Sequence, residues 1–120
     1  MSRPEAIRVD QVSGRIDWTE DGEAREAFVE GAADARYDPG NDRLIVLTRA
    51  SERGTVAIVA RDGGTVATIP PPDGYSLSHF ADSVAPVLVG QGEAPDGGWW
   101  DWHFEADEAG RALRRLGPAH

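Results

Sequence analysis

The sequence predicts an all-β fold of mainly antiparallel strands, arranged as a meander of β-hairpins. Short runs in which apolar and polar residues alternate are typical of strands with one face in the core and one in water. Pairs and clusters of Gly, Asp, Asn and Pro separate these runs, as hairpin turns do. A length of 120 residues fits one domain with its own core, which we expect to span residues 1–120.

Two strands are predicted near the N-terminus, around residues 7–9 and 16–18. In both places apolar residues alternate with charged ones, and Ser13-Gly14 provides a turn between them. Asp21-Gly22 is typical of a two-residue hairpin turn, in which both residues adopt a positive φ. We therefore expect the chain to reverse again at this point.

The segment 23–34 is compatible with a strand and with a short helix. Ala24, Ala27 and Phe28 have helical spacing, and alanine and glutamate favour helix. The hairpin turn before the segment and the pair Phe28-Val29 favour a strand. We expect a strand here and keep the short helix as the alternative.

The middle of the chain predicts a covered strand followed by a hairpin. Residues 37–42 read as a turn, because they contain Asp-Pro-Gly-Asn-Asp. Residues 44–47 are apolar throughout, which indicates a central strand buried on both faces. Residues 55–60 and 65–69 flank an Arg-Asp-Gly-Gly turn and form the clearest hairpin in the sequence, which Pro70–Pro72 ends.

The last third of the chain predicts further strands separated by loops. Residues 75–80 alternate as a strand does, and residues 84–89 form an apolar strand that Pro86 weakens. Residues 90–98 are rich in glycine and predict a loop. Residues 99–106 predict a long strand, because aromatic and charged side chains alternate along it.

Residues 107–116 also leave two structures open. They begin with a turn in which Gly110 is expected in a left-handed conformation, and then return as a strand. Leu113 and Leu116 equally suit a short helix ended by Gly117-Pro118. We expect the strand and keep the helix as the alternative.

Two stretches of predicted strands repeat the same pattern. Residues 44–47, a polar loop and the hairpin 55–69 correspond to residues 87–89, a polar loop and the hairpin 100–116. The offset between the two units is about 43–46 residues. A repeat of this length is typical of small antiparallel meanders arranged in series.

This pattern resembles the blades of β-propellers over about residues 35–117, and the motif Tyr-Asp-Pro-Gly-Asn-Asp-Arg-Leu at 37–44 is part of the resemblance. The resemblance implies hairpin repeats at about 35–72 and 76–117. Two or three blades cannot close a ring. The meanders would therefore form a sandwich, a small barrel or propeller-blade-like sheets, or complete a ring as a homo-oligomer.

The charge of the chain excludes several classes of function. Twelve arginines, no lysine and 21 acidic residues give a net charge of −9. Nucleic acids and anionic membranes need a basic surface, so we expect neither as a partner. A basic protein is the partner that fits, because complementary charge accelerates association.

The chain contains no cysteine, which excludes disulfides, thiolate metal sites and a thiol nucleophile. No apolar run approaches the ~20 residues that cross a bilayer, and no secretory leader is recognisable. We therefore expect a cytoplasmic protein.

The strand predicted at 99–106 carries the richest cluster of candidate functional residues. Side chains alternate between the two faces of a strand, so its aromatic and polar residues separate. The aromatic face, expected in the core, holds Trp100, Trp102 and Phe104. The polar face, expected in water, holds Asp101, His103 and Glu105. Trp99, at the loop end, is expected to stay exposed.

These features favour a non-enzymatic, acidic protein-interaction module, and we assign no cofactor, metal ligand or catalytic residue. Carboxylates would attract a basic partner and an exposed aromatic side chain would anchor it. The candidate binding residues are Asp17, Glu20, Tyr75, Trp99, Asp101, His103 and Glu105. In size and charge the chain is similar to the small acidic immunity proteins of bacteria, which implies an inhibitor of a basic partner.

Two alternatives use the same strand. In the first, the segment Trp99–Trp102 stacks on a sugar or a nucleoside while a carboxylate binds its hydroxyl groups. In the second, Asp101, His103 and Glu105 form the centre of a metal-dependent enzyme. His79 and Asp82 are then the candidates for a further ligand from a neighbouring strand.

Overall fold

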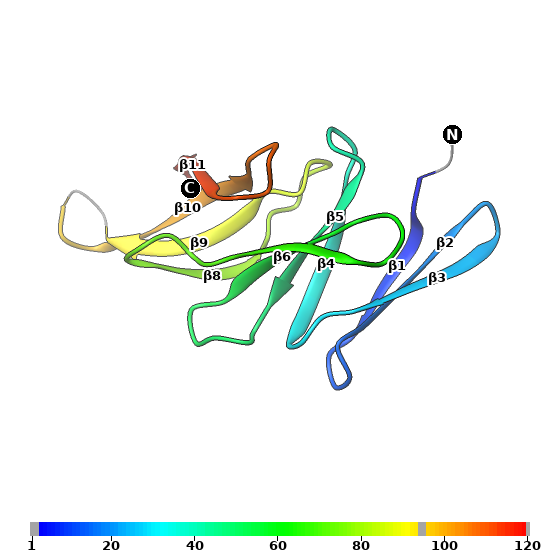
Figure 1. Ribbon diagram of the computed structural model, residues 1–120. Helices are drawn as coiled ribbons and strands as arrows, with labels where there is room; N and C mark the ends of the chain where they lie inside the picture. The colour runs from blue at the N-terminus through cyan, green and yellow to red at the C-terminus, as the bar shows by residue number, and fades with distance from the viewer. Residues whose placement is uncertain (1–2, 94–95, 120) are drawn as a thin grey trace.

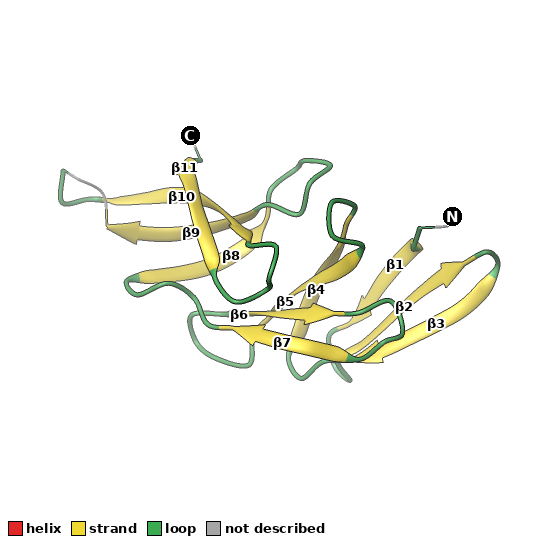
Figure 2. Cartoon of the chain, turned by 45° about the horizontal axis from the view of Figure 1, so that its top comes forward, coloured by secondary structure: helices red, strands yellow, loops and turns green. Residues whose placement is uncertain are grey.

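The computed structural model describes residues 3–93 and 96–119, and in this part of the chain eleven strands form three antiparallel sheets (Figures 1 and 2). The N-terminal sheet contains β1 (Glu5–Asp10), β2 (Arg15–Glu20) and β3 (Glu23–Phe28). The middle sheet contains β4 (Ala32–Asp38), β5 (Arg43–Thr48), β6 (Thr55–Val59) and β7 (Thr65–Ile69). The C-terminal sheet contains β8 (Tyr75–Phe80), β9 (Leu88–Glu93), β10 (Trp99–Ala106) and β11 (Leu113–Pro118).

The predicted all-β fold is confirmed, because each sheet is a meander of strands that are consecutive in the chain. The described residues contain no helix, so none of them forms a helix able to cross a membrane. The three sheets also stay open, and the small barrel among the predicted arrangements does not form.

The helical alternatives at 23–34 and 107–116 are wrong. β3 and the start of β4 occupy the first segment, and a turn followed by β11 occupies the second. In each case a tight turn reverses the chain, so that the residues after it pair as a strand with the strand before it. Asp21 and Gly22 have φ angles of 51° and 80°, the pair that a two-residue hairpin requires, and Gly110 has a φ of 69°.

The middle sheet is covered on both faces, as Figure 2 shows for the strands between the two outer sheets. Leu44 and Val46 of β5 pack into a core shared with the N-terminal sheet, which includes Ile16 and Trp18. The alternate residues of β5 pack into a second core shared with the C-terminal sheet. The covered central strand predicted at 44–47 is therefore confirmed.

β9 differs from the sequence-based prediction. The strand was expected at 84–89 with a loop over 90–98, but β9 runs from Leu88 to Glu93 and Val84 is 89% exposed. Two positions of this strand, Gly90 and Gly92, are occupied by glycine because aromatic rings fill the space that a side chain would need. A β-carbon at Gly90 would lie 2.9 Å from Cε2 of Phe104, and one at Gly92 would overlap the ring of Tyr75.

A buried ion pair within the middle sheet includes an arginine that also contacts the C-terminal sheet. Nε of Arg43 donates to Asp38 at 2.9 Å, and both residues are less than a tenth exposed. The guanidinium of Arg43 also donates to the backbone carbonyls of Asp107 and Glu108, at 2.7 and 3.1 Å. One side chain thus holds the turn between β10 and β11 against the start of β5.

The open edge of β8 is covered by the segment 49–53, which follows β5. The guanidinium of Arg49 donates to the carbonyl of Leu77 at 2.6 Å and to the carbonyl of Ser78. The backbone N–H of Leu77 donates to the carbonyl of Arg53 at 2.7 Å. Backbone groups on this side of the C-terminal sheet are therefore partly satisfied without another strand.

Replacing Gly92 by alanine tests the role of glycine in β9. We expect the substitution to destabilise the protein by about 1–3 kcal/mol, because the new methyl group displaces the ring of Tyr75. Gly117→Ala is the control, since no atom lies within 4 Å of the added carbon. Urea unfolding measures both, and equal free energies of unfolding would contradict the explanation for Gly92.

Replacing Arg43 by methionine tests the buried ion pair. We expect a loss of about 3–5 kcal/mol, because the substitution leaves the carboxylate of Asp38 buried without its cation. Arg15→Met, which removes exposed pairs with Asp17 and Glu26, is the control and should have a much smaller effect on stability. A similar loss of unfolding free energy for both variants would show that Arg43 does not hold the two sheets together.

Candidate functional site

β10 has the two faces that the sequence predicts. Trp102 and Phe104 are buried against the middle sheet, and Trp100 is half-buried on the same inner face. Asp101 is exposed on the opposite, outer face. His103 and Glu105 are half-exposed on that face. The buried rings therefore fix the position of the polar side chains.

Strand pairing extends the outer face across the C-terminal sheet. Asp101 lies opposite Gln91 of β9, and Gln91 lies opposite Ser76 of β8. Directly opposite residues of neighbouring strands point to the same face of a sheet. The three polar side chains thus form one row across three strands. His103 belongs to the next row, opposite Val89.

Trp99 lies among unpaired carboxylates at the end of this face. Its side chain is 67% exposed, and its strand partner is Glu93. Asp96 lies in the loop before it and Asp101 lies two residues after it. None of these three carboxylates forms an ion pair with a residue that the structure describes. We call Glu93, Asp96, Trp99 and Asp101 the Trp99 patch.

Two other predicted site residues are engaged within the C-terminal sheet. Glu105 forms an ion pair with Arg114 of β11. The ring of Tyr75 packs edge-on against Phe104 with centroids 5.0 Å apart, and its hydroxyl accepts a hydrogen bond from Arg115 at 2.8 Å. Neither side chain belongs to the Trp99 patch.

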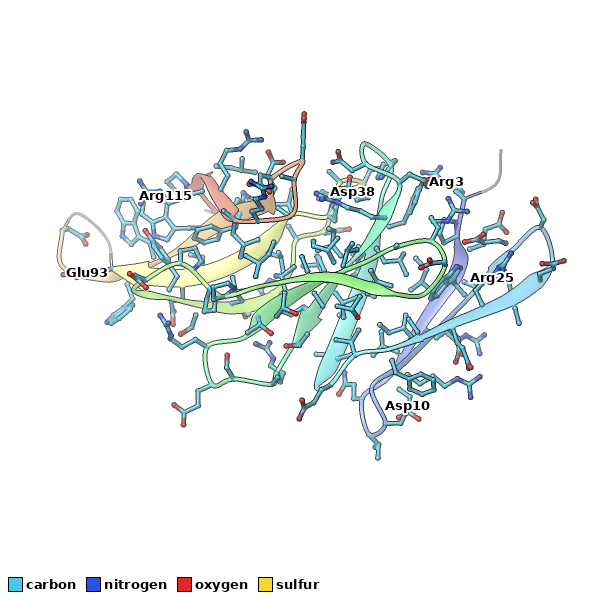
Figure 3. All side chains as sticks on the ribbon, viewed as in Figure 1. Arg3, Asp10, Arg25, Asp38, Glu93 and Arg115 are labelled. Carbon is cyan, nitrogen blue, oxygen red and sulfur yellow. The ribbon has the colours of Figure 1, made fainter. Side chains whose placement is uncertain are left out.

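Asp17 and Glu20 lie far from Trp99, in the N-terminal sheet. Figure 3 shows the separation, with Glu93 and Arg25 labelled at opposite ends of the molecule. Asp17 pairs with Arg15 at 2.7 Å. The structure therefore does not bring these two predicted residues together with Trp99 and Asp101.

Glu20 takes part in a network between the N-terminal and middle sheets. Its side chain is 12% exposed and accepts hydrogen bonds from Nε of Arg61 at 2.7 Å and from the indole of Trp18 at 2.8 Å. The hydrogen bond from Arg61 holds the pKa of the Glu20 carboxyl below its usual value, against the opposing effect of burial. Arg61, which follows β6, also pairs with Asp42 in the turn between β4 and β5. Its pair with Glu20 therefore joins the N-terminal sheet to the middle sheet.

A polar hollow of about 340 Å³ lies beside the row of Asp101, Gln91 and Ser76. Its walls are completed by Arg49, Leu77 and Ser78. Sequence reasoning did not identify Arg49, Ser76 or Gln91. The pairing of β8, β9 and β10 brings Ser76 and Gln91 to Asp101, and hydrogen bonds to the carbonyls of Leu77 and Ser78 bring Arg49 to the same hollow. No local pattern in the sequence carries that information.

A second hollow, of about 600 Å³, lies at the other end of β10. Its lining includes Asp38 and Glu105, each of which already forms an ion pair with an arginine. In residues 3–93 and 96–119 no three His, Asp or Glu side chains are grouped to hold a metal ion. The metal-dependent alternative gains no support from the described residues.

Comparison of the chain with models of protein families, with curated proteins and with solved structures found no match. The resemblances to propeller blades and to acidic immunity proteins therefore stay predictions. The chemistry of the exposed side chains is the remaining guide to function.

Acidification tests the contribution of Glu20. Because the folded state lowers the pKa of this carboxyl, its stabilising effect is complete above the ordinary value of 4.5 and is lost as the pH falls below it. We expect Glu20→Gln to be less stable than the parent protein at neutral pH and to approach it in acid. Urea unfolding over a pH series measures this change.

Glu52→Gln is the control for this experiment, because it removes an exposed carboxylate for which the structure describes no ion pair. Its free energy of unfolding should follow that of the parent protein over the whole series. A difference between parent and Glu20→Gln that stays constant with pH would contradict the assigned role of Glu20.

Proposed function

We propose that the protein is a non-enzymatic interaction module that binds a basic protein through the Trp99 patch. The observation that carries the proposal is the arrangement of three unpaired carboxylates around an exposed tryptophan. Tryptophan is the side chain that most often anchors a protein interface, because it buries a large area with few rotatable bonds. Carboxylates around such an anchor select a cationic surface.

The ion pairs elsewhere in the molecule support this location. Several carboxylates of the N-terminal and middle sheets form ion pairs with arginines, as in the pairs of Asp17 with Arg15 and of Asp34 with Arg36. The carboxylates of the Trp99 patch form no ion pair with a residue that the structure describes. An approaching basic protein is therefore attracted to this end of the C-terminal sheet, and the attraction weakens with salt.

The proposed mode of action is to cover the cationic surface of the partner, as an inhibitor would. β10 gives the patch a firm support, because the inner face of the same strand is packed with buried rings. An anchor on a rigid strand loses little conformational freedom on binding. No chemical step is required of the patch.

Titration of the ¹⁵N-labelled protein with an oligoarginine peptide at low ionic strength tests this proposal. We expect the largest chemical-shift changes at Glu93 and at residues 96–101, including the indole N–H of Trp99. Trp99→Ala should weaken binding by roughly tenfold, which corresponds to about 1.4 kcal/mol. Shifts spread evenly over the acidic surface would contradict a defined site.

A pair of matched double variants separates position from total charge. Glu93→Gln with Asp101→Asn removes two negative charges from the patch, and Glu52→Gln with Asp82→Asn removes two exposed charges elsewhere. The first pair should weaken peptide binding more than the second. Equal weakening would show that only net charge attracts the peptide, and would remove the Trp99 patch as the binding site.

A further inference from the structure

The hollow beside Asp101 offers a set of hydrogen-bonding groups that no other part of the protein uses. Asp101, Gln91 and Ser76 are exposed, and the side chain of none of them has a hydrogen-bond partner among the described residues. Neighbouring strands lie about 4.8 Å apart, so the row across three strands is about 10 Å long. That length matches a single small ring with its substituents.

Arg49 also lines the hollow and is held in place. Two of its N–H groups are used by the carbonyls of Leu77 and Ser78, and a guanidinium has five. Three donors therefore stay available on a side chain whose orientation is fixed. A fixed donor recognises a ligand with little loss of conformational entropy.

The charges of the hollow favour neutral ligands over ionic ones. Its lining carries both the guanidinium of Arg49 and the carboxylate of Asp101. A singly charged ligand is attracted by one of these two groups and repelled by the other, so its charge gains little from the hollow as a whole, whereas a hydroxyl group can donate to Asp101 or accept from Arg49. The amide of Gln91 and the hydroxyl of Ser76 both donate and accept, which again suits hydroxyl groups.

We infer that this hollow binds a neutral polyhydroxylated ring, that is, a monosaccharide unit. A volume of about 340 Å³ lies within the range of small-ligand sites, which is about 300–1,000 Å³. Trp99 lies on the same face of β10, two residues before Asp101, and its side chain is exposed. This site is distinct from the proposed partner surface, although the two share Asp101.

A set of sugars that differ in charge on one scaffold tests the inference. The ¹⁵N-labelled protein is titrated separately with glucose, galactose, mannose and N-acetylglucosamine, and with glucosamine and glucuronate as the cationic and anionic counterparts of glucose. At least one neutral sugar should shift the amides of Ser76, Gln91 and Asp101 and the side-chain amide of Gln91. Glucosamine and glucuronate should bind more weakly than that neutral sugar.

Substitutions in the row show whether the shifts report this site. Gln91→Ala and Ser76→Ala should each weaken binding of the neutral sugar by roughly tenfold, about 1.4 kcal/mol. Ser83→Ala, in the exposed loop before β9, is the matched control and should leave it unchanged. The amide spectrum of each variant shows directly that it is folded.

The inference is overturned if no neutral sugar shifts these amides, if a charged sugar binds more tightly, or if Gln91→Ala binds as the parent does. The sugar site and the proposed partner surface can fail independently, because different variants and different ligands test them. Gln91→Ala and Ser76→Ala leave the Trp99 patch intact, so oligoarginine binding should be unaffected by both. Loss of peptide binding in these two variants would show that the peptide, and not a sugar, occupies the hollow.

Discussion

Burial of the middle sheet on both faces is the constraint on which the rest of the structure depends. Successive residues of β5 enter two different cores, with Leu44 and Val46 on one side and Ile45 and Leu47 on the other. Burying such a side chain contributes about 1.5–3 kcal/mol. Neither core can form unless a second sheet covers it. The two outer sheets are therefore required by the composition of a single strand.

This layering also determines where a binding surface can lie. Each outer sheet has one face in a core and one in water, so its strands alternate apolar and polar residues. In the C-terminal sheet the apolar side consists largely of aromatic rings, which hold β10 against the middle sheet. Asp101 and the neighbouring polar side chains are positioned by packing on the other side of the same strand. The stability of the C-terminal sheet and the proposed binding surface thus depend on one segment of eight residues.

Much of the fold follows from local patterns in the sequence. The alternation of rings and charges predicts β10 with its bounds, and the run from Leu44 to Leu47 predicts a strand covered on both faces. Asp21-Gly22 identifies a hairpin because few other pairs adopt two positive φ angles. In these cases the information lies within a few neighbouring residues. Local sequence is then sufficient.

The errors arise where distant contacts decide the structure. Gly90 and Gly92 look like loop residues, but they lie in β9 because the rings of Phe104 and Tyr75 fill the space that their side chains would take. Arg49 is distant from Asp101 in the sequence, and only its hydrogen bonds to the edge of β8 bring both side chains to one hollow. Glu20 reads as a surface carboxylate, yet Arg61 from another sheet binds it and its side chain is only 12% exposed. No periodicity encodes such pairings.

The arginines at the edge of β8 have a consequence for the protein at high concentration. An uncovered edge strand is a template on which a second chain can add a strand, and repetition of that step builds fibrils. Arg49 occupies the carbonyls of Leu77 and Ser78, and the backbone of Arg53 occupies the N–H of Leu77. A growing cross-β assembly would have to displace a guanidinium that is already bound in place. The chain thus protects its most aromatic sheet against aggregation along this edge.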